Sequence, residues 1–312
     1  MWYKSYTDEC SINHTGSSGK REINHTNICK VAKVIVTKKI KGILGAKSYE
    51  ETLESKNSVN PDLISGKKIG VYVGVCHSES EKSNIYCPRV KTGLGITGVL
   101  STCPNGKTKS FDTNADGCAK SEAINVVFLQ KAKDALRIYA EIVKVKCEFT
   151  DLCLDETGPI YGFYRRPENM SNFLKRFYDE VNVSPKAVEY LEAVGSAIPE
   201  ADKSELEAIS EIFCKDRINP LLVGSVMSNI GYTAAASGLS ALTKVILGYE
   251  TGKIAANLHC DSPRQDVPAL REGKIRLVTD HTDFGRSYTA INGLSITGVN
   301  THVLLNGCYK PK

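Results

Sequence analysis

The sequence lacks the patterns that mark a metal site, a disulfide scaffold or a membrane span. Its eleven cysteines are scattered over 312 residues, with no Cys-x-x-Cys pair and no cluster of histidine and cysteine at metal-ligand spacing. No apolar run approaches the length of a bilayer-spanning helix, and the opening residues, Met-Trp-Tyr-Lys-Ser-Tyr, lack the apolar core of a signal peptide. We therefore expect no metal, reduced thiols, no membrane span and a cytoplasmic location.

Strong charge imbalance is also missing. The net charge is +5 with 24% charged residues, and a diffuse surplus of this size is typical of an ordinary surface, so we expect no nucleic-acid partner. Asn-His-Thr occurs at 13–15 and at 24–26, which matches the pattern for N-glycosylation. Without export these are chance tripeptides, and an extracellular glycoprotein is an alternative that rests on them alone.

The chain is long and apolar enough to form a large core. With 41% hydrophobic residues it can bury one large domain or two medium ones. Residues 1–32 are polar and rich in Ser, Asn, Thr and Lys, which predicts a disordered or loosely attached tail. We interpret residues 33–312 as a single domain.

Strand-like and helix-like segments alternate from residue 69 to 305. Strands are expected at 69–75, 124–129, 138–149, 188–193, 221–223 and 287–305. Helices are expected at 131–137, at 169–181, from about residue 202, and over 239–249, where apolar residues recur at helical spacing. This alternation predicts an α/β fold.

A short polar turn links the strand at 221–223 to the last of these helices. Gly224 and Ser225 break the apolar run directly after the strand. In α/β proteins, ligands and catalytic groups gather at the carboxyl ends of strands, so this turn is a candidate site.

The turn and three other segments resemble one family. Gly224, Ser225, Ser228, Asn229 and Gly231 match the motif Gly-Ser-x-Lys-Ser-Asn-x-Gly-His of β-ketoacyl synthases, the condensing domains of fatty-acid and polyketide synthases. The Asn-Pro stretch at 60–66 and its following strand resemble the animal fatty-acid synthase branch. Further matches to family motifs are Phe111, Asp112, Gly117, Glu122, Asn292, Gly298 and Asn300.

The resemblance implies a thiolase-like layered α/β fold and a reaction. Ketosynthases condense an acyl thioester with a malonyl thioester, with loss of carbon dioxide, in fatty-acid biosynthesis. The implied partners are an acyl carrier protein, an acyltransferase module and a second copy of the chain. The implied cofactor is the phosphopantetheine arm of the carrier, and we expect none bound by this domain itself.

The resemblance also implies a cysteine nucleophile, two histidines and a lysine, and this chain departs at each. Val194 and Tyr232 stand at the histidine positions and Met227 at the lysine position. No Asp-Thr-Ala-Cys-Ser-Ser motif occurs, and residues 82–93 run almost directly into the following family loop, so the fold is expected to lack the nucleophile segment. No residue is therefore assigned a catalytic role with confidence.

Other groups with chemistry offer no replacement. Cys76, Cys87, Cys103 and Cys118 lie nearby without opening a small-residue helix, and we expect unreactive or surface thiols. His77 next to Cys76 is a weak pair, because adjacent residues on an extended chain point to opposite sides. His259 and His302 are interpreted as structural.

The closing segment shows the same departure. Ser295 and Thr297 replace two glycines of the family loop, so a positive φ at either position would be costly, and Ile296 replaces its gating aromatic residue.

Two hypotheses therefore remain open. One is an active condensing enzyme. The other is a catalytically inactive relative that acts as a scaffold or dimerisation module, or an incomplete gene product. Because all four catalytic positions are lost, we expect no activity, and a weakened homodimer if the interface strand is missing.

Overall fold

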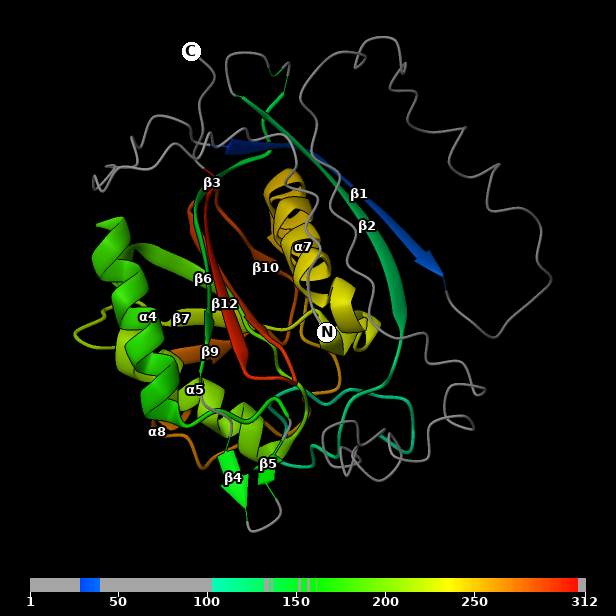
Figure 1. The fold of residues 1–312 in the computed structure, drawn as a ribbon, viewed down its shortest axis with the longest axis vertical. Helices are drawn as coiled ribbons and strands as arrows, with labels where there is room; N and C mark the ends of the chain where they lie inside the picture. Colours follow the sequence, from blue (N-terminus) through cyan, green and yellow to red (C-terminus); the bar gives the residue numbers. More distant parts are fainter. Residues whose placement is uncertain are drawn as a thin grey trace, which may run out of the picture.

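The fold is described here from a computed structural model that covers residues 29–39, 103–131, 135, 137–150, 153–155, 158–160 and 162–307. Its main element is an eight-stranded mixed sheet (Figure 1). In spatial order the strands are β2 (Glu122–Lys131), β1 (Cys29–Lys39), β3 (Ala140–Phe149), β12 (Val299–Asn306), β11 (Tyr288–Leu294), β6 (Val188–Glu192), β7 (Leu221–Gly224) and β9 (Ile275–Leu277).

The sheet changes character along this order. The strands from β2 to β11 pair antiparallel, whereas β11, β6, β7 and β9 run parallel. Two short two-stranded sheets lie apart from this sheet: the hairpin of β4 (Cys153–Asp155) with β5 (Gly158–Ile160), and the antiparallel pair of β8 (Lys253–Ile254) with β10 (Thr282–Asp283). The parallel half brings the carboxyl ends of β6 and β7 to one edge, where the candidate site lies.

Helices cover both faces of the sheet, with α4 and α5 on one side and α7 on the other (Figure 1). The helices are α4 (Pro167–Val181), α5 (Pro199–Phe213), α6 (Met227–Ile230), α7 (Ser237–Thr251) and α8 (Pro268–Arg271), with 3₁₀ turns at Pro185–Ala187 and Ala234–Ala236. Proline opens α4, α5 and α8 within the first turn, where its missing N–H costs nothing.

Strand alternation divides the core into two layers. Leu191 of β6 packs with Phe177 of α4 and Ile209 of α5, whereas its neighbour Tyr190 packs with Val245 of α7. All four side chains other than Tyr190 are apolar, and burying each of them contributes about 1.5–3 kcal/mol to folding. The two layers fix the height and direction of the strand ends.

Most of the expected elements are present. The strands expected at 124–129, 138–149, 188–193 and 221–223 are β2, β3, β6 and β7, and the segment 287–305 forms β11 and β12 in the middle of the sheet. The expected helices at 169–181, near 202 and over 239–249 are α4, α5 and α7. The α/β fold class is confirmed.

One expected element is wrong, and other expectations concern residues outside the described ranges. The helix expected over 131–137 is wrong at the described positions: Lys131 ends β2, and Ala135 and Arg137 have no regular structure. Pairing of Cys29 with Lys131 extends the β2 ladder through residues whose local pattern favoured a helix. The strand expected at 69–75 and residues 1–28 lie outside the described residues, and the boundary at residue 32 falls within β1.

No helix among the described residues is both long and apolar enough to cross a membrane.

Candidate functional site

The candidate site lies where the neighbouring parallel strands β6 and β7 end. Glu192 and Gly224, the last residues of the two strands, are register partners, and the N–H of Ala193 donates to the Gly224 carbonyl at 2.8 Å. The turns that follow each strand therefore start side by side. One carries Val194 and the other carries Ser225 and Met227, so the sequence-predicted motifs meet at one strand edge, as expected for an α/β protein.

The three degenerate family positions share one apolar cluster. Val194, Met227 and Tyr232 pack with Phe163 and Ala201, and both Val194 and Met227 are buried. The ring of Tyr232 meets the edge of Phe163 at a centroid distance of 5.2 Å. Where the family resemblance implies two histidines and a lysine, this chain thus places a mainly apolar contact, in which the Tyr232 hydroxyl is the one side-chain hydrogen-bond donor.

The residue at the gating position belongs to the same cluster. Ile296 and its neighbour Leu294 pack against it as half-buried side chains. Four of the positions at which the sequence departs from the family motifs, Val194, Met227, Tyr232 and Ile296, therefore lie in one apolar cluster.

A polar framework surrounds the cluster, and Ser225 lies at its centre. The Ser225 hydroxyl donates to the Val194 carbonyl at 2.7 Å and accepts from the Met227 N–H at 3.2 Å. The Ser225 N–H donates to Oδ1 of Asn257 at 3.1 Å, and the amide of Asn257 donates to the Ser110 carbonyl at 3.1 Å. Through these bonds Ser225 ties both strand-end turns to the 103–121 loop.

The other retained turn residues also hold backbone. The Ser228 hydroxyl donates to the Ser225 carbonyl at 2.8 Å and accepts from the Leu258 N–H at 3.0 Å, while the Asn229 amide donates to the Ala256 carbonyl at 2.8 Å. Gly231 has a φ of 77°, and a Cβ there would lie 2.6 Å from the Ala119 carbonyl oxygen. Glycine is thus required at this position by both conformation and space.

A buried network of hydrogen-bonded side chains supports the turn that contains Val194. Glu205 of α5 accepts from the N–H groups of Val194 and Gly195 at 3.0 and 3.1 Å and from the Asn292 amide at 3.0 Å. The Asn292 carbonyl oxygen then lies 2.7 Å from Nδ1 of His302.

The amide orientation fixes the tautomer of His302. Because Asn292 turns its NH₂ toward Glu205, its oxygen must accept a proton from Nδ1 of His302, which leaves Nε2 to accept from the Tyr178 hydroxyl at 3.1 Å. His302 is fully buried, and burial lowers its pKa to about 3, so the ring is neutral at physiological pH. This is the structural role expected for His302.

Glu192 at the end of β6 forms a second buried polar group. Its carboxylate accepts from the Tyr190 hydroxyl and the Val226 N–H, and it lies 3.0 Å from the ammonium nitrogen of Lys244. The Lys244 contact is ionic, since Lys244 Nζ is buried without an aligned hydrogen bond. Gly224 lies directly against this group, since a Cβ there would meet the Tyr190 hydroxyl at 2.7 Å.

The retained residues of the closing segment are structural too. The Asn300 oxygen accepts from Nε of Arg165 at 2.9 Å, and the Gly298 carbonyl accepts from the Thr150 N–H at 2.8 Å with a φ of 96° at Gly298. Neither Ser295 nor Thr297 has a positive φ. The loop has therefore settled into a conformation that residues with side chains can adopt.

The remaining motif residues divide between the framework and the surface. Phe111 is buried with a φ of 66°, and the Asp112 carboxylate accepts from the N–H groups of Asn114 and Ser262, each at 2.7 Å. Glu122 is exposed at the start of β2 and takes no part in the site. His259 is half-buried with a φ of 60°, which is a local turn feature.

The cysteines near the site are poor nucleophiles. Burial raises the pKa of the Cys118 thiol to about 11 and that of Cys260 to about 12, and burial also raises the pKa values of Cys103 and Cys214. All four are therefore thiols at neutral pH. Cys76, Cys87 and His77 lie outside the described residues.

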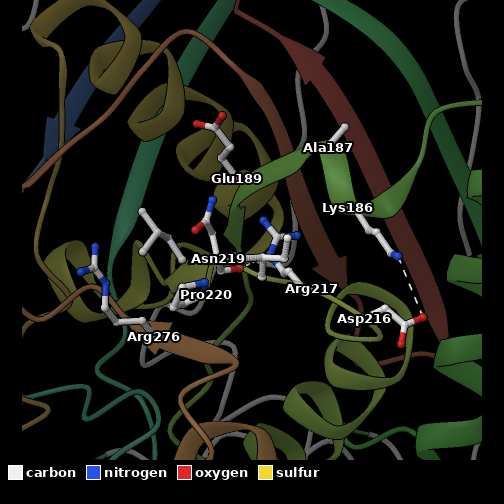
Figure 2. Close-up of a pocket in the computed structure, with 10 residues that line it drawn as sticks. Lys186, Ala187, Glu189, Asp216, Arg217, Asn219, Pro220 and Arg276 are labelled. Atoms are coloured by element: carbon white, nitrogen blue, oxygen red, sulfur yellow. Dashed lines mark hydrogen bonds and ion pairs between the residues drawn. The ribbon is translucent and has the colours of Figure 1, made fainter.

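A cavity of about 670 Å³ lies at the opposite end of the strands, where β6, β7 and β9 begin (Figure 2). Its charged lining residues are Lys186, Glu189, Asp216, Arg217 and Arg276. Lys186 and Asp216 approach to 4.0 Å across it. No sequence-predicted position lines this cavity. Across the described ranges, no group of three or more His, Cys, Asp or Glu side chains could hold a metal ion.

Sequence reasoning missed several framework residues. Lys244, Asn257, Arg165 and Tyr178 are buried or bonded parts of the site, and none was singled out. Lys244 had a visible signal, because it is the one charged residue between Leu239 and Tyr249. The others gave none, since each has a partner more than 100 residues away.

Solved ketosynthases share this architecture. A ketosynthase from module 6 of the bacillaene synthase of Bacillus subtilis matches with a TM-score of 0.63 and 22% identity, covering 78% of this chain and 42% of that one. A module 1 ketosynthase of the bacillaene synthase of Bacillus amyloliquefaciens matches with a TM-score of 0.59 and 23% identity, covering 66% and 37%. The chain is thus an α/β protein of the thiolase-like ketosynthase fold.

The sequence comparisons identify the family. Residues 154–261 match the family model of the β-ketoacyl synthase C-terminal domain. The chain is 33% identical over 224 residues to "Probable polyketide synthase 25" of Dictyostelium discoideum, and 32% identical over 219 residues to "Highly reducing polyketide synthase SAT13" of Stachybotrys chartarum, with 68% of this chain covered in each case. The protein belongs to the β-ketoacyl synthase family. It spans 9% of the length of both relatives.

Proposed function

We propose that this chain is a non-catalytic ketosynthase domain that serves a fatty-acid or polyketide synthase as a scaffold or docking module. The observation that carries this proposal is the apolar cluster of Val194, Met227 and Tyr232 at the strand ends. Loss of carbon dioxide from a malonyl thioester leaves negative charge on the remaining carbon and oxygen. Stabilising that charge requires preorganised donors, and neither valine nor methionine supplies one.

The state of the thiols supports the same proposal. Acyl transfer requires a thiolate, which forms where cationic groups or a helix N-terminus lower the pKa of a cysteine. Two buried thiols of the described residues, Cys118 and Cys260, instead have pKa values of about 11 and 12 because of burial. At neutral pH their thiolate fractions are therefore far below those of reactive cysteines.

The retained framework supports a role in binding rather than in chemistry. Its hydrogen bonds hold the strand-end turns although nothing remains in the cluster for them to orient. The proposed partners are an acyl carrier protein, whose phosphopantetheine arm would supply the implied cofactor, an acyltransferase module and a second copy of the chain in a weakened homodimer. The polyketide synthases named above favour a polyketide context over a fatty-acid one.

The test is a condensation assay. The purified chain is incubated with acyl-carrier and malonyl-carrier thioesters and scored for release of carbon dioxide and for 3-oxoacyl product. We expect neither above a boiled control, and none from the triple variant Val194→His, Met227→Lys, Tyr232→His, because the catalytic set acts as a unit with its nucleophile. Turnover that a thiol-alkylating agent abolishes would overturn the proposal by showing that one of the eleven cysteines has been recruited.

The binding half is tested separately. Titration of a fluorescent phosphopantetheinylated carrier protein should give saturable binding by the folded chain, with the isolated carrier and an unrelated α/β protein as controls. Sedimentation should show dissociation to monomer in the nanomolar range. A tight dimer at that concentration would contradict the weakened interface.

A further inference from the structure

Asp202 lies between two chain segments that the fold has to hold in place. It belongs to the first turns of α5 and is buried. Its Oδ2 accepts from the N–H groups of Phe111 at 2.9 Å and Ala197 at 3.2 Å, and its Oδ1 accepts from the Ser196 hydroxyl at 3.1 Å. One side chain thus ties the 103–121 loop and the 193–198 turn to the same helix.

Both backbone donors are in conformations that need such support. Phe111 has a φ of 66° and Ala197 a φ of 58°, which is the left-handed region that residues with a Cβ disfavour. Such a conformation is unfavourable and persists only where surrounding contacts fix it. The bonds to Oδ2 are contacts of this kind, so weakening them frees both segments at once.

The charged surroundings of Asp202 do not favour an ionised carboxylate. Glu205 on the same helix carries like charge, and Cys118 lies near Asp202 on the 103–121 loop. From the 259–267 segment come Cys260 and Arg264. Asp202 itself has no hydrogen bond to a cation within the described part of the chain.

The guanidinium of Arg264 is already engaged. It donates to both carboxylate oxygens of Asp266 at 2.7 and 2.8 Å and to the Pro199 carbonyl at 2.6 Å. Its attraction for Asp202 is a minor effect. Burial dominates and raises the pKa of Asp202 to about 7.

The hydrogen-bond geometry accepts a neutral acid without losing a bond. Oδ2 can remain the acceptor of both N–H groups, while a proton on Oδ1 is donated to the Ser196 hydroxyl oxygen. That oxygen already accepts from the Ile198 N–H at 3.3 Å and has a second lone pair for the new donor.

We propose that Asp202 is a pH-sensitive latch, which holds the 103–121 loop and the 193–198 turn on α5 as a neutral acid and loosens both when it ionises. The direction follows from linkage. An open segment exposes Asp202 to water, where its pKa returns to near 3.8, so the closed form binds the proton more tightly than the open form. Raising the pH from 4 to 7 therefore favours opening, and the effect levels off above pH 7.

Amide hydrogen exchange read by mass spectrometry tests the latch directly. Peptides covering 108–118 and 193–198 are followed at pH 5, 6, 7 and 8, with rates corrected for the intrinsic pH dependence of exchange. The corrected opening equilibrium should rise by up to about tenfold per pH unit between pH 5 and pH 7 and then level off. Peptides from α7 serve as the internal reference and should not change.

The matched variant is Asp202→Asn, which stays neutral and can accept both N–H groups while its NH₂ donates to Ser196. It should show pH-independent exchange in both segments. Wild-type exchange that does not change between pH 5 and pH 8, or a variant that keeps the wild-type pH dependence, would overturn the proposal.

A second measurement covers the case in which Asp202→Asn does not fold. Carbon-13 NMR of the Asp202 carboxyl in the wild-type chain should give a titration midpoint near 7, and Glu205→Gln should move that midpoint to lower pH by removing the neighbouring charge. A wild-type midpoint near 4 would exclude the latch.

Discussion

Two regions of opposite polarity lie side by side at the strand ends of β6 and β7. The polar framework, built by Ser225, Glu205, Asn292 and His302, keeps the family residues and bonds nearly all of their polar groups. The apolar cluster beside it, which contains Val194 and Met227, retains one weak donor, the Tyr232 hydroxyl, in place of the two histidines and the lysine of the family chemistry. The framework maintains the fold, whereas the cluster occupies the position at which the family reaction takes place. The residues of the two regions can therefore change independently.

The framework should be the more sensitive region, and its buried ion pair should show the largest effect. Lys244→Met removes the ammonium 3.0 Å from Glu192 and leaves a fully buried carboxylate without its cation. We expect a loss of about 3–5 kcal/mol in the free energy of unfolding, measured by urea denaturation.

The double variant Glu192→Gln, Lys244→Met provides the control for that measurement. Because it removes both charges, it should be more stable than Lys244→Met alone. Equal losses in the two variants would mean that packing of the lysine stem, and not the charge pair, carries the effect.

The cluster should tolerate apolar changes and reject charge. Met227→Leu nearly conserves volume and should cost less than about 1.5 kcal/mol. Met227→Lys restores the family residue type but buries an ammonium among hydrocarbon groups, so we expect a loss of about 3 kcal/mol at neutral pH. Thermal unfolding of the two variants side by side gives the comparison. A stable lysine variant would instead show that the framework still offers this position a carboxylate.

The sequence predicted which residues belong to the framework better than it predicted which groups they bond to. Gly224, Ser225, Asn229 and Asn292 stand in local motifs, so their positions at strand ends could be read from neighbouring residues. Other bonds of the framework could not be predicted. Asn257 bonds to Ser110 and His302 bonds to Tyr178 across more than 120 residues, and nothing in the neighbouring sequence encodes such pairs. The loss of family donors at the cluster could be read from the sequence. The packing of Val194, Met227 and Tyr232 against one another could be seen only in the fold.

The fold shows the same limit. Apolar periodicity predicted α4, α5 and α7 because all residues of a helix face lie in one short segment of the sequence. It failed over 131–137, where pairing with the distant β1 decides that Lys131 belongs to a strand. Local pattern thus predicts an element well where its packing face is continuous and poorly where a remote strand completes it.

Two framework groups should give opposite pH dependences of stability. Burial lowers the pKa of His302 to about 3 from its usual 6.5, so its contribution to stability is lost as the pH falls from 6.5 toward 3. Burial raises the pKa of Asp202 to about 7, so its contribution is lost as the pH rises from about 4 to 7. Between pH 4.5 and 6 the two nearly cancel.

Single variants should separate them. Relative to wild type, Asp202→Asn should add about 1.4 kcal/mol per pH unit of stability as the pH rises from 4.5 to 6, and His302→Gln should remove about the same amount. Urea unfolding at three pH values measures both slopes. Parallel curves for all three proteins would mean that neither group is titrated by folding.

The smallest effect should come from returning glycine to the closing loop. Thr297→Gly replaces a residue whose φ is not positive, so glycine gains no conformation that the loop needs and adds freedom to the unfolded chain, at a cost of about 0.5–1 kcal/mol. Ser295→Gly should cost slightly more, because the Ser295 hydroxyl also accepts from the N–H groups of Thr297 and Val299 at 3.2 and 3.1 Å. Differential scanning calorimetry of both variants against wild type resolves changes of this size. A gain in stability from either glycine would show that the loop is strained by its side chains, and that the closing loop has not adapted to the loss of the family sequence.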